Sequence, residues 1–234
     1  MSRAHAVLVS LLMLAAAQRA DGIAPIGHGK APDTIAARVQ GCATCHGPAG
    51  QGTPGFPRIA GKPTGYIFNQ LRNFRDGRRS YPPMNYLLEY LQDDYFKAMA
   101  AFFADQRIAF APPENSALSA GDLARGNQLA RQGDAQRGVP PCMACHGPKL
   151  TGIEPGIPGL LGLSSRYISG QLEAWRAGTR HANPPDCMSE VASRLTEGEI
   201  TAVAGWLASR PVSLPYVPAP EGKWTPPLAC GSQP

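Results

Sequence analysis

Two short motifs of the same form, 100 residues apart, constrain this chain more than any other feature of its sequence. Residues Cys42–Gly47 read CATCHG, and residues Cys142–Gly147 read CMACHG. In each motif two cysteines stand three positions apart, so that they share one face of a helical turn, and a histidine follows the second cysteine. Each motif therefore presents two thiols and one imidazole within a single turn.

The two motifs belong to a longer internal repeat. The other matched segments are Gly65–Arg79 with Arg166–Arg180, Asp94–Ala104 with Gly198–Ala208, and the Pro-Pro pairs that precede Met84 and Met188. Four landmarks in the same order and at a nearly constant offset indicate a duplicated domain. The pattern predicts a first domain over residues 21–107, a linker over 108–120, a second domain over 121–210 and a Pro-rich tail over 211–234.

Helical periodicity dominates both repeats. Apolar residues recur at helical spacing in the matched segments that follow each motif. Asp33 and Ser119 are placed to cap the helices before the two motifs, and Thr196 with Glu199 forms a capping box. No segment shows sustained strand alternation, and Gly and Pro together supply 50 of the 234 residues. We therefore expect an all-α fold of two tandem helical domains with long Gly/Pro-rich loops.

A CxxCH motif is the attachment signal of a c-type haem. The two thiols reach two vinyl groups along one haem edge, and the histidine offers a neutral nitrogen to the iron. The sequence predicts two covalently bound haem c groups, attached through Cys42, Cys45, Cys142 and Cys145, with His46 and His146 as iron ligands. Two large apolar rings would also fill the cores of small domains that have only 7% aromatic residues.

Three other interpretations of these cysteines are weaker. A Cys₄ zinc site would span an unusual gap of about 100 residues and leave both histidines unexplained. A thioredoxin-like redox motif needs a βαβ context that the sequence lacks. Disulfides within the two CxxC turns are the third alternative.

Methionine is the expected second ligand of each iron. Met84 and Met188 lie 42 and 46 residues after the first cysteine of their motif, each just after a Pro-Pro pair that stiffens the loop. Met143 lies between two attachment cysteines and cannot reach around the ring. Met99 corresponds to Val203 in the second repeat, which favours core packing. Ordinary loop packing is the alternative for Met84 and Met188.

Two prolines at matched positions are candidates for supporting the histidines. A metal-bound histidine usually donates its other N–H to an acceptor, which fixes the ring. Pro57 and Pro158 follow the two motifs at an offset of 101, and their carbonyl groups are the acceptors that we predict. A plain turn at these positions is the alternative.

The N-terminus has the order of a secretory signal peptide. Arg3 precedes a 12-residue apolar run, Ala6–Ala17, and small residues follow. We expect residues 1–20 to be a signal peptide, cleaved after about Ala17 or Ala20, and the mature protein to be periplasmic. The run is too short to span a bilayer comfortably. The net charge is +5 without any run of five Lys or Arg residues, which gives no support to nucleic-acid binding.

With these residues in view, the chain resembles the dihaem c-type cytochromes of the cytochrome c4 class, which consist of two tandem class I cytochrome c domains. The resemblance covers about residues 33–210 and rests on both CxxCHG motifs, the FPRIAG and IPGLLG segments, the two tyrosine-containing helices and the two methionine loops. It implies His–Met ligation, by His46 with Met84 and by His146 with Met188, and haems near the domain interface.

Cys187 and Cys230 remain once four cysteines hold haem, and the resemblance does not predict them. In an oxidising compartment a spare pair most often forms a disulfide, which here would tie the tail to the Met188 loop. Free or intermolecular thiols are a second option. A third is that the Cys187 thiolate binds iron, which would lower the reduction potential and favour catalysis.

The primary functional hypothesis is an electron carrier, not an enzyme, although it can serve as the cytochrome subunit of an oxidoreductase. His–Met ligation occupies both axial coordination positions of the haem iron and raises its reduction potential. The expected partners are a cytochrome bc-type complex, a terminal oxidase or a periplasmic dehydrogenase, and peripheral association with a membrane is compatible with this role. The alternatives are a dihaem oxidoreductase with an open or thiolate-ligated haem that acts on a small sulfur compound or peroxide, and a structural or assembly factor.

Overall fold

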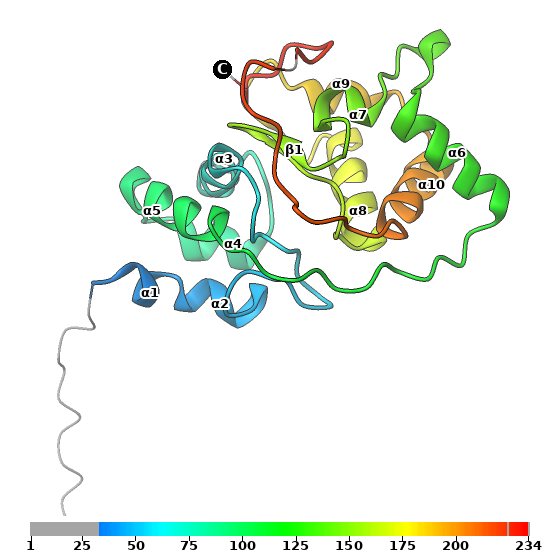
Figure 1. The fold of residues 1–234 in the computed structure, drawn as a ribbon. Helices are drawn as coiled ribbons and strands as arrows, with labels where there is room; N and C mark the ends of the chain where they lie inside the picture. The colour runs from blue at the N-terminus through cyan, green and yellow to red at the C-terminus, as the bar shows by residue number, and fades with distance from the viewer. Residues whose placement is uncertain (1–32, 224, 234) are drawn as a thin grey trace, which may run out of the picture. The chain divides into compact units, whose positions relative to one another are not determined.

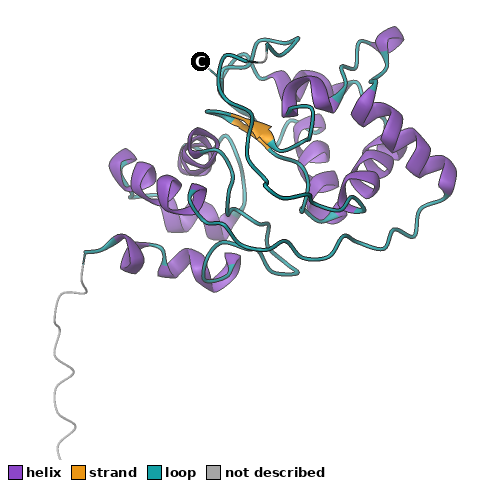
Figure 2. Ribbon diagram, viewed as in Figure 1, coloured by secondary structure: helices purple, strands orange, loops and turns teal. Residues whose placement is uncertain are grey.

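Helices joined by long loops make up almost all of the protein (Figures 1 and 2). The computed structural model describes residues 33–223 and 225–233, so the predicted signal peptide lies outside the described residues. Within them are ten α-helices, one 3₁₀ helix and two strands of two residues each. The all-α prediction is therefore confirmed. No helix in this part of the chain is long and apolar enough to cross a membrane.

The first helical group surrounds its own apolar core. Its helices are α1 (Ile35–Arg38), α2 (Gln40–His46), α3 (Thr64–Arg75), α4 (Pro82–Leu88) and α5 (Asp93–Ala104). α3 packs on α5 and α4, and α1 packs on α5. The core includes Phe96, Met99 and Phe103, all from one face of α5. Met99 is therefore a core residue, as the comparison of the repeats predicts.

The second helical group repeats this plan. Its elements are α6 (Ala120–Arg131), η1 (Ala135–Arg137), α7 (Cys142–His146), β1 (Gly152–Ile153), β2 (Ile157–Pro158), α8 (Ser165–Arg176), α9 (Cys187–Ser193) and α10 (Glu197–Ala208). α10 is buried on most sides because both α6 and α8 pack against it. A Cβ atom at Gly126 of α6 would collide with the carbonyl group of Ala202 on α10. Glycine is therefore what allows these two helices to pack so closely.

Helix capping follows the sequence at two of three predicted sites. Ser119 caps α6, and Thr196 with Glu199 forms the predicted capping box of α10. The prediction for α1 is wrong: Thr34 caps the helix by accepting from the N–H group of Ala37. The carboxylate of Asp33 instead accepts hydrogen bonds from the side chain of Arg38, 2.8 Å away.

The linker and the tail bind to both helical groups. Arg58 donates to the carbonyl groups of Ile108 and Ala109 at 2.7 and 3.0 Å, which holds the linker against the first group. The tail is joined to α9 by a disulfide between Cys187 and Cys230, as the sequence suggests. The side chain of Asn69 on α3 also donates to the tail, so the tail contacts both helical groups.

Candidate haem sites

The two CxxCH motifs form matching helical turns. α2 ends at His46 and α7 ends at His146, and the next residues, Gly47 and Gly147, both have φ +82°. This backbone conformation favours glycine and turns the chain sharply after each histidine. All four motif cysteines are free and half-buried, with their two thiols on one side of each turn. They are thus available for covalent attachment.

Each histidine is oriented by a proline carbonyl group. Nδ1 of His46 lies 2.8 Å from the Pro57 oxygen, and Nδ1 of His146 lies 2.7 Å from the Pro158 oxygen. A carbonyl oxygen only accepts, so Nδ1 carries the proton and Nε2 keeps its lone pair. β1 and β2 pair antiparallel, with Gly152 opposite Pro158, and this pairing holds the second carbonyl group in place. Both imidazoles are therefore prepared to bind a metal through Nε2.

Burial keeps both imidazoles neutral. It lowers the pKa of His46 below its ordinary value and lowers the pKa of His146 to about 4. A neutral imidazole is the form that binds iron. Burial also raises the pKa of the Cys142 thiol to about 12, so this cysteine has none of the thiolate character of a thioredoxin-like redox motif.

One cavity of about 610 Å³ connects the two sites. Its lining includes all four motif cysteines, both histidines, Met84 and Met188. Apolar side chains from both cores line much of the cavity, among them Leu71, Leu88, Leu172 and Leu207. A large apolar cavity with paired thiols and one prepared imidazole at each end fits two covalently attached haems. The structure thus brings the sequence-predicted ligands together around one space.

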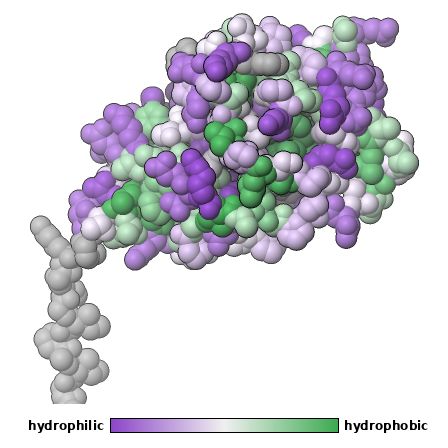
Figure 3. All heavy atoms as spheres, viewed as in Figure 1, coloured by the Kyte–Doolittle hydropathy of each residue, from purple (hydrophilic) through white to green (hydrophobic). Residues whose placement is uncertain are grey.

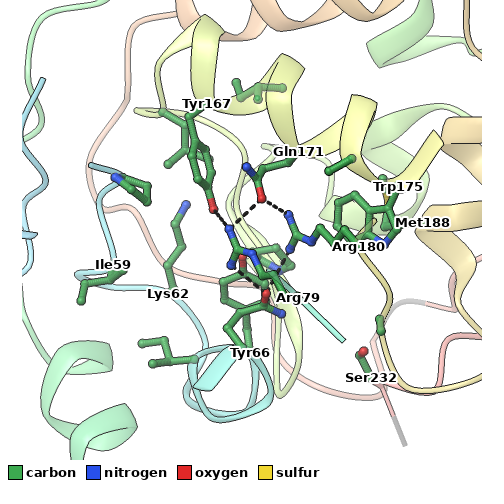
Figure 4. Close-up of a pocket in the computed structure, with 18 of the residues that line it drawn as sticks. Ile59, Lys62, Tyr66, Arg79, Tyr167, Gln171, Trp175, Arg180, Met188 and Ser232 are labelled. Carbon is green, nitrogen blue, oxygen red and sulfur yellow. Dashed lines mark hydrogen bonds between the residues drawn. The ribbon is translucent and has the colours of Figure 1, made fainter. Parts of the chain in front are cut away.

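A polar cluster crosses between the two helical groups at this cavity (Figure 4). Arg79 donates to Tyr167 and Gln171 of the second group at 3.0 and 2.7 Å. Arg180 donates in return to Gln70 of the first group at 3.0 Å. No motif in the sequence singles out these residues. The signal was present, because Arg79 and Arg180 match at an offset of 101, as do Gln70 and Gln171.

The other interpretations of the cysteines find no support. Within residues 33–223 and 225–233, no group of three or more His, Cys, Asp or Glu side chains could hold a metal ion, as a zinc site would require. Cys187 is bonded to Cys230 and is not available as a thiolate ligand. The hypothesis of a thiolate-ligated haem is therefore wrong.

Comparisons with known proteins agree with this site. The Cytochrome c family model matches residues 34–106. The chain is 37% identical over 192 residues to the thiosulfate dehydrogenase electron acceptor of Thiomonas intermedia, covering 81% of this chain and 86% of that protein. It is 33% identical to cytochrome c4 of Pseudomonas aeruginosa, covering 86% of this chain and 96% of the other.

A solved structure is also similar. The structure of a thiosulfate dehydrogenase from Marichromatium purpuratum matches with a TM-score of 0.66 and 36% sequence identity. The match covers 73% of this chain but only 36% of that one. The similarity is thus to one part of a larger enzyme.

Proposed function

The chain belongs to the cytochrome c4 family of dihaem c-type cytochromes, and we propose that each of its two irons is bound by one histidine and one methionine. His46 and Met84 would bind the first iron, and His146 and Met188 the second. The observation that carries this assignment is that both histidines have Nδ1 on a proline carbonyl group and line one cavity with both methionines. We place the domain boundaries at residues 107 and 121.

Electron transfer, not substrate turnover, is the function of such a protein. A haem iron with two protein ligands exchanges one electron at a time and has no open position for a substrate. The chain's own residues favour this ligation: the proline carbonyl groups fix the imidazoles, and much of the cavity lining is apolar. We therefore treat the protein as an electron carrier.

We propose that an enzyme that oxidises thiosulfate supplies the electrons. Two relatives that are 37% and 38% identical to this chain are electron acceptors of thiosulfate dehydrogenase. A segment that makes up 36% of a solved thiosulfate dehydrogenase chain has a similar fold. The predicted signal peptide and the disulfide between Cys187 and Cys230 support a periplasmic location.

We propose that the donor docks at α4. Tyr86 is 77% exposed, Leu87 is 51% exposed, and Tyr90, just after the helix, is 80% exposed. Leu87 also lines the cavity, as does Met84 on the same helix. On the face drawn in Figure 3, hydrophobic and hydrophilic residues are interspersed. A small exposed apolar surface next to a redox centre suits a transient contact.

The direct test is electron uptake. The oxidised holoprotein is mixed with purified thiosulfate dehydrogenase and thiosulfate, and the absorption of reduced haem is followed. We expect both haems to be reduced, with one electron each, only when enzyme and thiosulfate are both present. Absence of reduction under these conditions would contradict the proposed donor. A parallel sample with a chemical reductant shows that the haems are competent.

A further inference from the structure

The described part of the Pro-rich tail contacts the second haem site on its histidine side. The tail runs past β1 (Figure 1), where the N–H group of Ala219 donates to the carbonyl group of Gly152 at 2.8 Å. The N–H group of Glu154 donates in return to the carbonyl group of Ala219 at 2.9 Å. The adjoining strand β2 carries Pro158, whose carbonyl group orients His146. The tail therefore braces the hairpin that holds the imidazole in place.

The end of the tail is fastened on the methionine side of the same site. A disulfide joins Cys230 of the tail to Cys187, which is the residue before Met188. The next residue of the tail, Gly231, donates to the carbonyl group of Pro185 at 2.9 Å. Both disulfide cysteines line the haem cavity, as does Met188. The segment that carries the methionine is thus held to the tail by a covalent bond and a hydrogen bond.

The last described residue of the tail connects the two sides. The side chain of Gln233 accepts from the N–H group of Gly156 at 2.9 Å and donates to the carbonyl group of Glu154 at 2.7 Å. Ser232, just before it, lines the haem cavity. One segment thus reaches from the histidine side to the methionine side. Cys187 and Cys230 form the sole disulfide in the described part of the chain, so the helix that carries Met84 has no such bond.

We propose that the tail is a clamp, closed by the disulfide between Cys187 and Cys230, that keeps Met188 on the second iron until a dithiol opens it. The proposal rests on the proposed function, because it requires His146 and Met188 as ligands. In the opening step the two sulfur atoms of the dithiol join, two electrons and two protons pass to the protein disulfide, and its cysteines become thiols. The Met188 segment then opens locally more often, which gives a small neutral ligand access to the second iron.

The test measures carbon monoxide binding by the purified holoprotein, with the irons reduced by ascorbate, which leaves disulfides intact. Untreated wild-type protein should bind none. After anaerobic treatment with dithiothreitol it should bind about one equivalent, because one iron has lost its second protein ligand. The thioether bonds of the haems are not disulfides and survive this treatment. Cys187→Ser with Cys230→Ser should bind the same amount without treatment.

Two further variants show which iron opens and why. Met188→Ala should bind about one equivalent before treatment and no more after it, because its second iron is already open. Glu199→Gln is the matched control for a general loss of stability. It removes the carboxylate of the α10 capping box and leaves the disulfide and the tail contacts in place, so it should bind none. The absorption band of methionine-ligated ferric haem is a second readout, and opening should remove about half of it.

Three results would overturn the proposal. Absence of carbon monoxide binding by the dithiothreitol-treated protein would show that the disulfide does not hold Met188, and this result needs no variant that has to fold. Binding of about two equivalents, or binding by Glu199→Gln, would indicate general loosening instead of a clamp at one site. Binding by the untreated wild-type protein would contradict the His–Met ligation itself, which separates failure of the proposed function from failure of the clamp.

Discussion

The helices that carry Met84 and Met188 match in sequence position but are restrained in opposite ways. α4 begins with Pro82 and Pro83, and the side chains of Tyr86 and Leu87 on it are exposed to solvent. α9 begins at Cys187, which is joined by a disulfide to the tail, and Gly231 of the tail donates to the carbonyl group of Pro185. α4 is thus exposed to contact by a partner, whereas α9 is held to the tail by a disulfide and a nearby hydrogen bond.

This difference indicates a division of labour between two otherwise similar sites. Both repeats provide the same histidine, proline and methionine pattern, so both are built for electron transfer. We infer that the first site exchanges electrons with the donor and that the disulfide between Cys187 and Cys230 restrains the second site. Substitutions in each helical group test this asymmetry, with expected effects from a large loss of stability to a small shift in reduction potential.

Removal of the disulfide should have the largest effect. Cys187→Ser with Cys230→Ser opens a loop of 43 residues, and the chain-entropy relation gives about 4 kcal/mol for such a loop. We expect this loss in the free energy of unfolding, measured by guanidinium denaturation of the holoprotein. Wild-type protein treated with a dithiol reductant should show the same loss. Unchanged stability of the double variant would show that the disulfide does not restrain α9.

The second helical group should lose stability in acid. Burial alone would raise the pKa of Glu199, but hydrogen bonds from Arg137, Thr196 and Arg125 outweigh burial and lower it to about 2. Because the folded pKa is below the ordinary value of 4.5, the stabilisation is complete above pH 4.5. It is lost as the pH falls from about 4.5 to about 2. The matched residue of the first repeat is Tyr95, so that group lacks this contribution.

Glu199→Gln should therefore cost about 3 kcal/mol at pH 7, because one pKa unit corresponds to about 1.36 kcal/mol. The measurement is the free energy of unfolding at about pH 7 and at about pH 2.5. The difference between variant and wild type should shrink at the lower pH. A difference that is equal at both values would contradict the assignment to this carboxylate.

The exposed surface of α4 should govern the rate of electron uptake without affecting stability. Tyr86→Ser with Leu87→Ser should slow reduction by the donor enzyme about tenfold, which is about 1.4 kcal/mol in activation free energy. Leu214→Ser with Val217→Ser is the matched control, since both residues are exposed but lie in the tail. Stopped-flow absorption measures both rates. Equal slowing in the two double variants would refute docking at α4.

Lys62 offers the smallest and most selective test. Its ammonium group donates to the carbonyl group of Gly159, next to the proline that orients His146, although Lys62 belongs to the first repeat. The matched residue in the second repeat is Leu163. Burial lowers the pKa of Lys62 to about 7, so the test is made at about pH 6, where the side chain is charged. There Lys62→Met should make the reduction equilibrium of the second haem about fivefold less favourable and leave the first nearly unchanged. Redox titration should show this, and equal shifts at both haems would contradict it.

Many features of the haem sites could be predicted from the sequence, but not all. The repeat offset predicts the placement of Pro57 and Pro158 because each proline is only 11 or 12 residues from its histidine, and so short a chain segment can turn back in few ways. The pairing of Cys187 with Cys230 is predicted because few cysteines are left to choose from. Arg79 and Arg180 show the limit: their repeat match is visible, but the sequence does not show that each reaches into the other helical group. That depends on how the two groups pack.

Competition between adjacent residues explains why the residue that caps α1 is not the one we predicted. Asp33 and Thr34 are adjacent, and both residue types cap helices. Arg38 lies within reach of Asp33 and pairs with its carboxylate, which leaves Thr34 to cap α1. A pattern of capping residues alone does not decide between neighbours when a charged partner is nearby.

Carbon monoxide binding to the dithionite-reduced protein tests whether both irons have two protein ligands. If His46 with Met84 and His146 with Met188 occupy the axial positions of the two irons, the absorption spectrum should not change when carbon monoxide is added. Met84→Ala and Met188→Ala should each open one site and bind about one equivalent. Binding of carbon monoxide by the wild-type protein, at one or two equivalents, would contradict the account of two closed electron-transfer sites.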